Sequence, residues 1–158
     1  MKGWTLLELL VVLLVLVITS TAVWPAWQQL ERRLALKSGL EETLSLLNST
    51  RAEALLHQRV TVCSDQGCDR FPWSQGLVSW NHRGQQLGRA HLPKDVLIVW
   101  RGFRGTALVF EDRGRLRFQN GSLLLCHRKL PADGHRVVLN WVGRPRVEAA
   151  RTGDCLVD

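Results

Sequence analysis

The chain has 158 residues, which leaves room for one domain and a membrane anchor and no more. It carries 21 Lys and Arg residues against 14 Asp and Glu residues, a formal net charge of +7. The excess lies in residues 80–158, which hold 14 basic and seven acidic residues, whereas residues 28–79 hold six of each. A basic lobe of this kind indicates nucleic acid or phospholipid headgroups as partner, or else a solvated basic surface with no such ligand.

The N-terminal segment is apolar from Leu6 to Ile18 except for Glu8. The 21 residues from Trp4 to Trp24 are enough to span a bilayer as a helix, at about 1.5 Å per residue. Lys2 would then stay in the cytoplasm. An ordinary secretory signal cut near Ser20-Thr21-Ala22 is an alternative. Glu8 fits neither reading, because an ionisable group in a membrane helix costs about 2.5–3.5 kcal/mol or more.

Cleavage after Gly3 would explain Glu8, since the new amine of Trp4 lies four residues earlier on the same helix face and can neutralise the carboxylate. Gly3 followed by Trp4-Thr5-Leu6-Leu7-Glu8 resembles the type IV prepilin signature, although most members have Phe where this chain has Trp4. Pro25 falls where these proteins usually carry a proline. The resemblance implies a leader of residues 1–3, removed by a prepilin peptidase.

From Gln28 to about His57 the pattern is that of an amphipathic helix. Leu36, Leu40, Leu44 and Leu47 form a stripe that packs against a sheet, and charged residues fill the other faces. We expect Pro25 to kink the helix without ending it. The helix would run from Trp4 to His57, with residues 4–27 in the membrane and residues 28–158 in a soluble domain.

Short strands separated by Gly, Pro and Asn turns follow Arg59. Asn120-Gly121 predicts a hairpin between two of them. With no second helix visible, the connections must be antiparallel, so the predicted fold class is α+β, a long N-terminal helix on small antiparallel sheets. The predicted strands are Val60–Ser64, Leu77–Asn81, Val96–Arg101, Ala107–Phe110, Leu116–Gln119, Leu123–His127, Arg136–Val142 and Arg146–Glu148.

Four cysteines lie beyond the apolar segment, which fits an oxidising compartment and two disulfides with three possible pairings. Cys63–Cys68 and Cys126–Cys155 are favoured, because the first pair closes a tight turn. A zinc site made of cysteines and His127 is the rival, but the spacing fits no standard pattern.

Catalytic motifs are missing from the sequence. It has no phosphate-binding glycine-rich loop, no Gly-x-Ser-x-Gly and no His-Glu-x-x-His, and we expect neither an enzyme nor a cofactor. The five histidines are scattered and are interpreted as surface residues: His57, His82, His91, His127 and His135.

The C-terminal part resembles the FimT/GspH group of minor pilins and pseudopilins. A Phe-x-x-x-Gly element (Phe110, Gly114), a strand ending in Cys126 and the motif Gly143-Arg144-Pro145-Arg146 occur here in the order found in that group. In FimT-type members the Gly-Arg-x-Arg motif is associated with DNA binding during natural transformation. The resemblance extends that role to Arg144 and Arg146.

The local chemistry agrees with a phosphate clamp. Pro145 favours an extended Arg144, so Arg144 and Arg146 would project to the same side about 6.5–7 Å apart, and Gly143 adds no side chain to block a ligand. Arg128, Lys129, Arg136 and Arg151 are candidate outer contacts. Alternatively, Arg144 and Arg146 only protect a sheet edge from unwanted pairing.

The resemblance implies a single-pass inner-membrane protein with its C-terminal domain in the periplasm, incorporated into a pilus. Its partners would be other pilins, the peptidase, the membrane assembly platform and the DNA backbone. Two alternatives remain: a structural minor pilin or type II secretion pseudopilin that does not bind DNA, and an anchored protein that binds anionic lipid.

Overall fold

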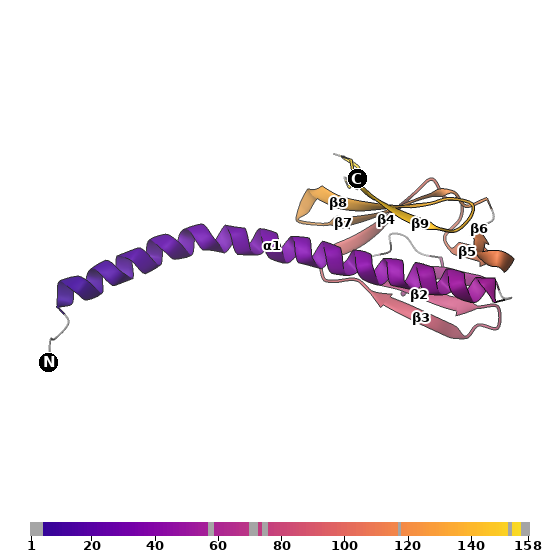
Figure 1. Cartoon of the computed structure of the whole chain (residues 1–158), viewed down its shortest axis with the longest axis horizontal. Coiled ribbons are helices and arrows are strands. Elements are labelled where there is room, and N and C mark those ends of the chain that lie inside the picture. Colours follow the sequence, from indigo (N-terminus) through magenta and orange to yellow (C-terminus); the bar gives the residue numbers. More distant parts are fainter. Residues whose placement is uncertain are drawn as a thin grey trace. The chain divides into compact units, whose positions relative to one another are not determined.

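The computed structural model describes residues 5–56, 59–69, 73, 76–116, 118–151 and 153–155. The chain divides into two compact units, residues 1–33 and 34–158. One helix, α1 (Leu6–Leu55), is followed by strands and a short 3₁₀ turn (Figure 1). These are β1 (Val60–Ser64), β2 (Gly76–Asn81), β3 (Gln86–His91), β4 (Val96–Arg101), β5 (Leu108–Glu111), η1 (Asp112–Gly114), β6 (Arg115–Leu116), β7 (Gly121–His127), β8 (Leu130–Leu139) and β9 (Pro145–Ala149).

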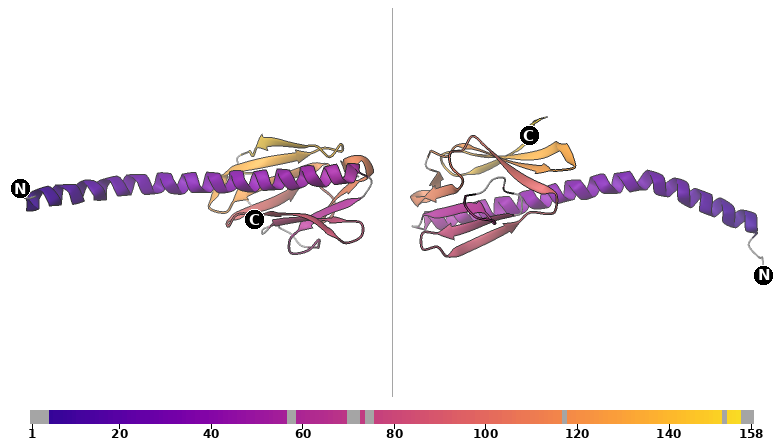
Figure 2. Two further views of the ribbon diagram at one scale, coloured as in Figure 1. Left: turned by 60° about the horizontal axis from the view of Figure 1, so that its bottom comes forward. Right: turned by 180° about the vertical axis from the view of Figure 1, so that it is seen from behind.

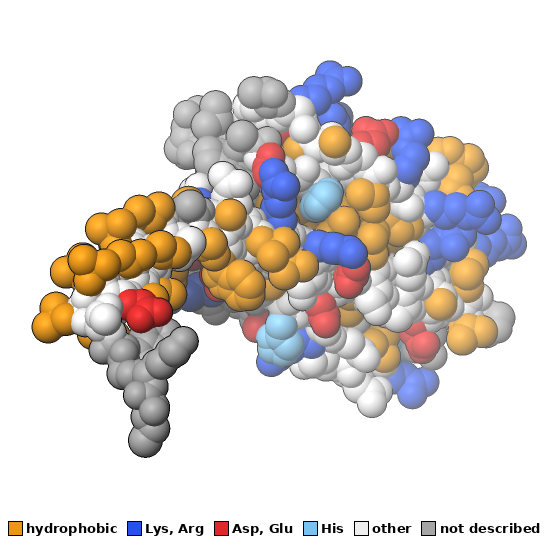
Figure 3. All heavy atoms as spheres, turned by 60° about the vertical axis from the view of Figure 1, so that its left-hand side comes forward, with side chains coloured by type: hydrophobic (Ala, Val, Ile, Leu, Met, Phe, Trp, Pro, Cys, Tyr) orange, Lys and Arg blue, Asp and Glu red, His pale blue; other side chains and the backbone are white. Residues whose placement is uncertain are grey.

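The N-terminal unit is built from the apolar part of α1. By length and composition α1 can cross a membrane, with a mean hydropathy of 2.7 in its most apolar window, and that window is not buried by the rest of the chain. Figure 3 shows apolar side chains covering this part of the helix. The hydroxyls of Thr19 and Ser20 donate to Val15 O and Val17 O at 2.9 and 2.8 Å, so neither needs water.

Pro25 lies inside α1, and the helix continues through it as expected. In the C-terminal unit the predicted leucine stripe is confirmed: Leu36, Leu40 and Leu47 are buried and Leu44 is half-buried. The helix ends at Leu55, whereas His57, where we expected the end, lies outside the described residues.

The strands form two antiparallel sheets, a five-stranded sheet in the order β3-β2-β1-β5-β6 and a four-stranded sheet in the order β4-β7-β8-β9. Residues 34–55 of α1 lie along both sheets (Figure 2). One core joins the three parts, with Leu47 from the helix, Val62 and Phe110 from the first sheet, and Leu125 and Val137 from the second. The predicted α+β fold is confirmed.

The strand predictions differ from the structure in several places. β8 is Leu130–Leu139, whereas the predicted strand was Arg136–Val142. β3 was not predicted, because its sequence QLGRAH is mostly exposed at the edge of its sheet and lacks an apolar alternation. The Asn120-Gly121 hairpin is wrong, because β6 and β7 lie in different sheets. β6 stops at Leu116 and Phe118 adopts φ +54°, which no strand residue does.

The side chain of Gln119 replaces the strand pairing that was expected there. Its amide accepts from Val109 N–H at 2.7 Å and donates to Ala107 O at 2.7 Å. This satisfies the backbone at the start of β5 without a continuous partner strand, so the chain is free to cross to the second sheet.

Candidate nucleic-acid interface

The β8–β9 turn carries Gly143 at its tightest point. Gly143 N–H donates to Asn140 O at 2.9 Å, and its φ of +75° is one that only glycine adopts easily. A Cβ added here would lie 2.2 Å from Gly114 O and 3.2 Å from Phe110 Cε1. The Phe-x-x-x-Gly element and the glycine of the Gly-Arg-x-Arg motif therefore pack on each other. Gly143 is thus required for this packing contact.

The end of α1 completes this junction. Arg51 Nε donates to Val142 O at 3.3 Å, and a Cβ on Gly114 would lie 3.0 Å from Arg51 Cγ and 3.2 Å from Arg51 O. Leu116 N–H donates to Trp141 O at 3.0 Å. These contacts hold together the end of α1, the η1 turn and the β8–β9 turn. They therefore fix the position of the backbone at Gly143, directly before Arg144.

Arg144 and Arg146 both have exposed side chains, but their surroundings differ. Arg144 lies in the loop before β9, whereas Arg146 lies on β9 and forms an ion pair with Glu148 two residues along the same strand face. The side chain of Arg146 is 74% exposed, so this pair contributes little to stability and a phosphate can compete for the guanidinium.

Arg146 belongs to a row across the outer face of the second sheet. Arg101 on β4 lies opposite Ser122 on β7, Ser122 opposite Val138 on β8, and Val138 opposite Arg146 on β9. With strands about 4.8 Å apart, the two arginines are separated by about 14 Å at the backbone. Arg136, one of the predicted outer contacts, donates from Nε to Ser122 Oγ at 2.9 Å, between them. We call Arg101, Arg136 and Arg146 the outer-face arginines.

Arg101 was not among the predicted contacts. It is the last residue of the predicted strand Val96–Arg101, and the inward positions of that strand are Val96 and Ile98, so the alternation would have placed Arg101 on the outer face. What the sequence could not indicate is that β4 and β9 belong to one sheet, which brings Arg101 into line with Arg146.

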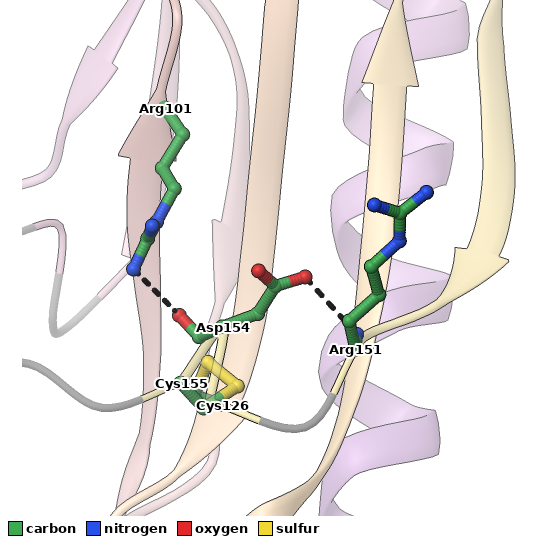
Figure 4. Close-up of a disulfide and its surroundings, with 5 residues drawn as sticks. All are labelled: Arg101, Cys126, Arg151, Asp154 and Cys155. Atoms are coloured by element: carbon green, nitrogen blue, oxygen red, sulfur yellow. Dashed lines mark hydrogen bonds between the residues drawn. A yellow bond between two sulfur atoms is a disulfide. The ribbon is translucent and has the colours of Figure 1, made fainter.

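The C-terminal segment crosses this outer face. A disulfide joins Cys126 on β7 to Cys155, with their Cα atoms 5.5 Å apart, and the segment covers Leu124. Figure 4 shows Asp154 between Arg101 and Arg151: Arg101 Nη2 donates to Asp154 O at 3.1 Å, and Arg151 N–H donates to Asp154 Oδ2 at 3.0 Å. The exposed side chain of Arg151, a predicted outer contact, thus lies beyond the end of β9.

Arg128 and Lys129 lie elsewhere. They form the β7–β8 turn, and the ten residues of β8 put this turn about 30 Å from the β8–β9 turn. Lys129 Nζ lies 3.0 Å from Asp95 Oδ2, and this hydrogen bond lowers the pKa of Asp95. Both residues are exposed, but the structure does not bring them to Arg144. Figure 3 shows the scatter of Lys and Arg side chains over the domain.

His127 precedes this turn and is buried, with 5% exposed, so its interpretation as a surface residue is wrong. Lys129 N–H donates to His127 Nδ1 at 3.2 Å. Among the described residues no group of His, Cys, Asp and Glu could hold a metal ion.

Comparison with known proteins identifies the family of this chain. The family profile described as type II transport protein GspH matches residues 40–143. The chain belongs to this family. Minor pilins and pseudopilins are structural components of pili or secretion systems, so the chain is a filament subunit and not an enzyme. Its family implies contact with other pilins, and its apolar helix agrees with a membrane anchor.

Two crystal structures of the type IV minor pilin FimU from Pseudomonas aeruginosa strain PAO1 share the fold. One has 19% identity and a TM-score of 0.62 and covers 76% of this chain and 96% of that chain. The other has 20% identity and a TM-score of 0.59, covering 74% and 98%. None of the curated proteins compared with this chain matches it.

The GspH match includes Phe110, Gly114 and Gly143 and ends immediately before Arg144. The family match therefore covers the residues that pack the junction, together with Arg101 and Arg136, but not Arg144 and Arg146.

The residues predicted for processing lie at the other end of the chain. Gly3 and Trp4 are outside the described residues. Glu8 is exposed on α1, and its N–H donates to Thr5 Oγ1 at 3.3 Å, so Thr5 caps the helix start. The second disulfide joins Cys63 to Cys68, with Cα atoms 4.9 Å apart, and closes the turn after β1. Both pairings favoured by the sequence are therefore formed in the structure.

Proposed function

We propose that this GspH-family subunit is a FimT-like minor pilin of a type IV pilus and that it binds the phosphate backbone of DNA for uptake in natural transformation. The observation that carries the proposal is the arrangement of the outer-face arginines with Arg144. Arg101, Arg136 and Arg146 lie on one sheet face, and Arg144 is exposed two residues before Arg146.

The chemistry of these groups suits phosphate. Guanidinium groups donate bidentately to phosphate oxygens, and contacts to the backbone carry no base information. Binding is therefore expected to be independent of sequence and to weaken as salt rises, because each contact releases condensed counterions. Glu148 and the Asp154 carbonyl hold two of the arginines in place in the free protein without a buried charge.

The proposal includes the route to the pilus. The prepilin peptidase would cut between Gly3 and Trp4, residues 4–27 would remain in the inner membrane, and the domain from residue 28 would lie in the periplasm. The assembly platform would then insert the subunit among other pilins.

A second candidate is a structural minor pilin or a type II secretion pseudopilin that primes or caps the filament. The observation that favours it is the contact of Gly143 with Gly114, which gives the glycine of the Gly-Arg-x-Arg motif a role in packing. In that case Arg144 and Arg146 would protect the β9 edge.

Replacement of both Arg144 and Arg146 by Gln tests the choice. We expect weaker binding to unrelated DNA sequences alike, and a plot of log affinity against log salt that is flatter by about one unit per lost contact. The measurement is fluorescence anisotropy with labelled duplexes at several salt concentrations, using the full chain in neutral detergent micelles.

The matched control is the double variant Arg128→Gln, Lys129→Gln, which removes the same charge about 30 Å away. It should keep most of the affinity and the original slope. Equal losses in the two variants would mean that only net charge matters, and no loss in the Arg144 and Arg146 variant would favour the structural candidate.

Replacement of Glu8 by Ala tests the anchor. If its carboxylate pairs with the amine of Trp4 in the filament, we expect less of the subunit in sheared pili, measured by immunoblot, and an unchanged melting temperature of the β domain. Glu31→Ala, on the exposed surface of the same helix beyond the apolar run, is the control. Incorporation that is the same in both variants would rule out the charge pairing.

A further inference from the structure

A small pocket lies beside the β8–β9 turn. Its volume is about 290 Å³, and it is lined by Glu111, Arg115, Leu116, Phe118, Asn120 and Trp141. That volume is just below the usual range of ligand sites, about 300–1,000 Å³. It therefore suits one planar ring system better than a folded peptide segment.

Two large aromatic side chains of this pocket are open to solvent. Phe118 is 85% exposed and Trp141 is 56% exposed. Phe118 has φ +54°, a left-handed conformation that is costly for a bulky residue and that marks functional positions when the surroundings enforce it. The enforcing contacts come from Gln119, whose amide is bound to Val109 N–H and Ala107 O. These hydrogen bonds anchor the residue that follows Phe118, so the backbone that carries the exposed ring has a fixed place in the fold.

The charge around these rings is positive. The guanidinium of Arg115 lies 5.2 Å from the centroid of the Trp141 ring, a cation–π contact. The carboxylate of Glu111, the acidic group of the pocket, already accepts from Arg59 Nη2 at 3.0 Å. Trp141 also shares the β8–β9 turn with Arg144, which is three residues further along the chain. One face of the Trp141 ring therefore carries a guanidinium, and a ligand that enters the pocket meets this positive charge.

From the exposed rings, the pocket size and the adjacent arginines, we infer that this pocket binds one unpaired nucleobase of a DNA single strand. The base stacks on Phe118 and Trp141, and Arg115 and Arg144 contact the flanking phosphates. Every base has a π face, so stacking of this kind is tolerant of sequence. A base inside a duplex cannot reach the rings, and the pocket therefore adds a preference for single strands or frayed ends to the binding proposed above, on which it rests.

The test compares a thymidine oligonucleotide with a blunt duplex of the same length, using the full chain in detergent and anisotropy at fixed salt. Phe118→Leu keeps an apolar side chain but removes the π face. We expect it to weaken single-strand binding about tenfold and to leave duplex binding unchanged. Phe118→Trp should restore single-strand binding. An unchanged thermal unfolding curve for Phe118→Leu shows that the loss is local, because the side chain is exposed.

The possible results distinguish a failure of the nucleobase pocket from a failure of DNA backbone binding by the arginines. Duplex binding that depends on Arg144 and Arg146, with no effect of Phe118→Leu on single strands, overturns the pocket and leaves the phosphate clamp. A wild-type chain that binds neither probe overturns both. If Phe118→Leu keeps both affinities but lowers incorporation into pili, the pocket holds a side chain of a neighbouring pilin, and the nucleobase assignment is wrong.

Discussion

Replacing Gly143 by Ala is expected to lower the free energy of unfolding by about 3 kcal/mol or more. Two costs combine at this position. A φ of +75° is unfavourable for any residue with a Cβ, by roughly 1–2 kcal/mol. The added Cβ would also lie 2.2 Å from Gly114 O, a backbone atom that cannot rotate away. One of the two turns must shift, and the Arg51 to Val142 hydrogen bond and the Leu116 to Trp141 hydrogen bond would be strained with it.

Gly84→Ala is a matched control for this prediction. Gly84 also has φ +75°, but a Cβ there meets nothing within 4 Å. We therefore expect only the backbone cost of about 1–2 kcal/mol. Urea denaturation of the full chain in neutral detergent, followed by tryptophan fluorescence, measures both. Equal losses in the two variants would mean that the junction relaxes around the new methyl group.

The Gly-Arg-x-Arg motif is therefore better tested at its arginines than at its glycine. A Gly143 variant that no longer binds DNA would have lost the junction that positions Arg144, so the loss would not identify a ligand contact. Substitutions of Arg144 and Arg146, whose side chains are exposed, separate binding from folding.

The sequence predicted the fold where burial follows a simple period. The leucines of the stripe, spaced three or four residues apart, pack against the core. β1 and β4 begin and end at the predicted residues, because both are short, mostly apolar runs next to turn residues. β3 escaped prediction because an exposed edge strand needs no such alternation. The predicted strand Leu116–Gln119 was too long. The Gln119 side chain binds the backbone where a partner strand was expected, and a side-chain contact of this kind leaves no periodic signal in the sequence.

Only part of the candidate site could be predicted, because the order of strands in a sheet leaves no signal in the local sequence. Arg144, Arg146 and Arg136 could be proposed from the motif and the charge excess, but their neighbours depend on strand order. Arg101 is level with Arg146 only because β4 and β9 lie in one sheet, and Arg128 is distant because β8 is long. The contact of Gly143 with Gly114 joins two turns 29 residues apart, and nothing in the local sequence of either turn indicates the other.

Removal of the Cys126–Cys155 disulfide is the second large effect expected. The two cysteines are 29 residues apart, and closing a loop of that length in the unfolded chain corresponds to about 3.5 kcal/mol in the loop-entropy description. The bond also holds the C-terminal segment over Leu124 and fixes Asp154 beside Arg101. The double variant Cys126→Ala, Cys155→Ala should therefore unfold at a lower urea concentration and also become more sensitive to carboxypeptidase.

The other disulfide provides the comparison. Cys63 and Cys68 are only five residues apart, so the same description gives about 2 kcal/mol for their removal. A Cys63→Ala, Cys68→Ala variant should lose less stability and keep the C-terminal segment resistant to carboxypeptidase. If the Cys63 and Cys68 variant loses more stability than the Cys126 and Cys155 variant, the longer bridge does not stabilise the domain by holding the C-terminal segment. If the Cys126 and Cys155 variant also loses DNA affinity while remaining folded, the segment positions Arg101 for binding, because Asp154 O is the acceptor that holds its guanidinium on the outer face.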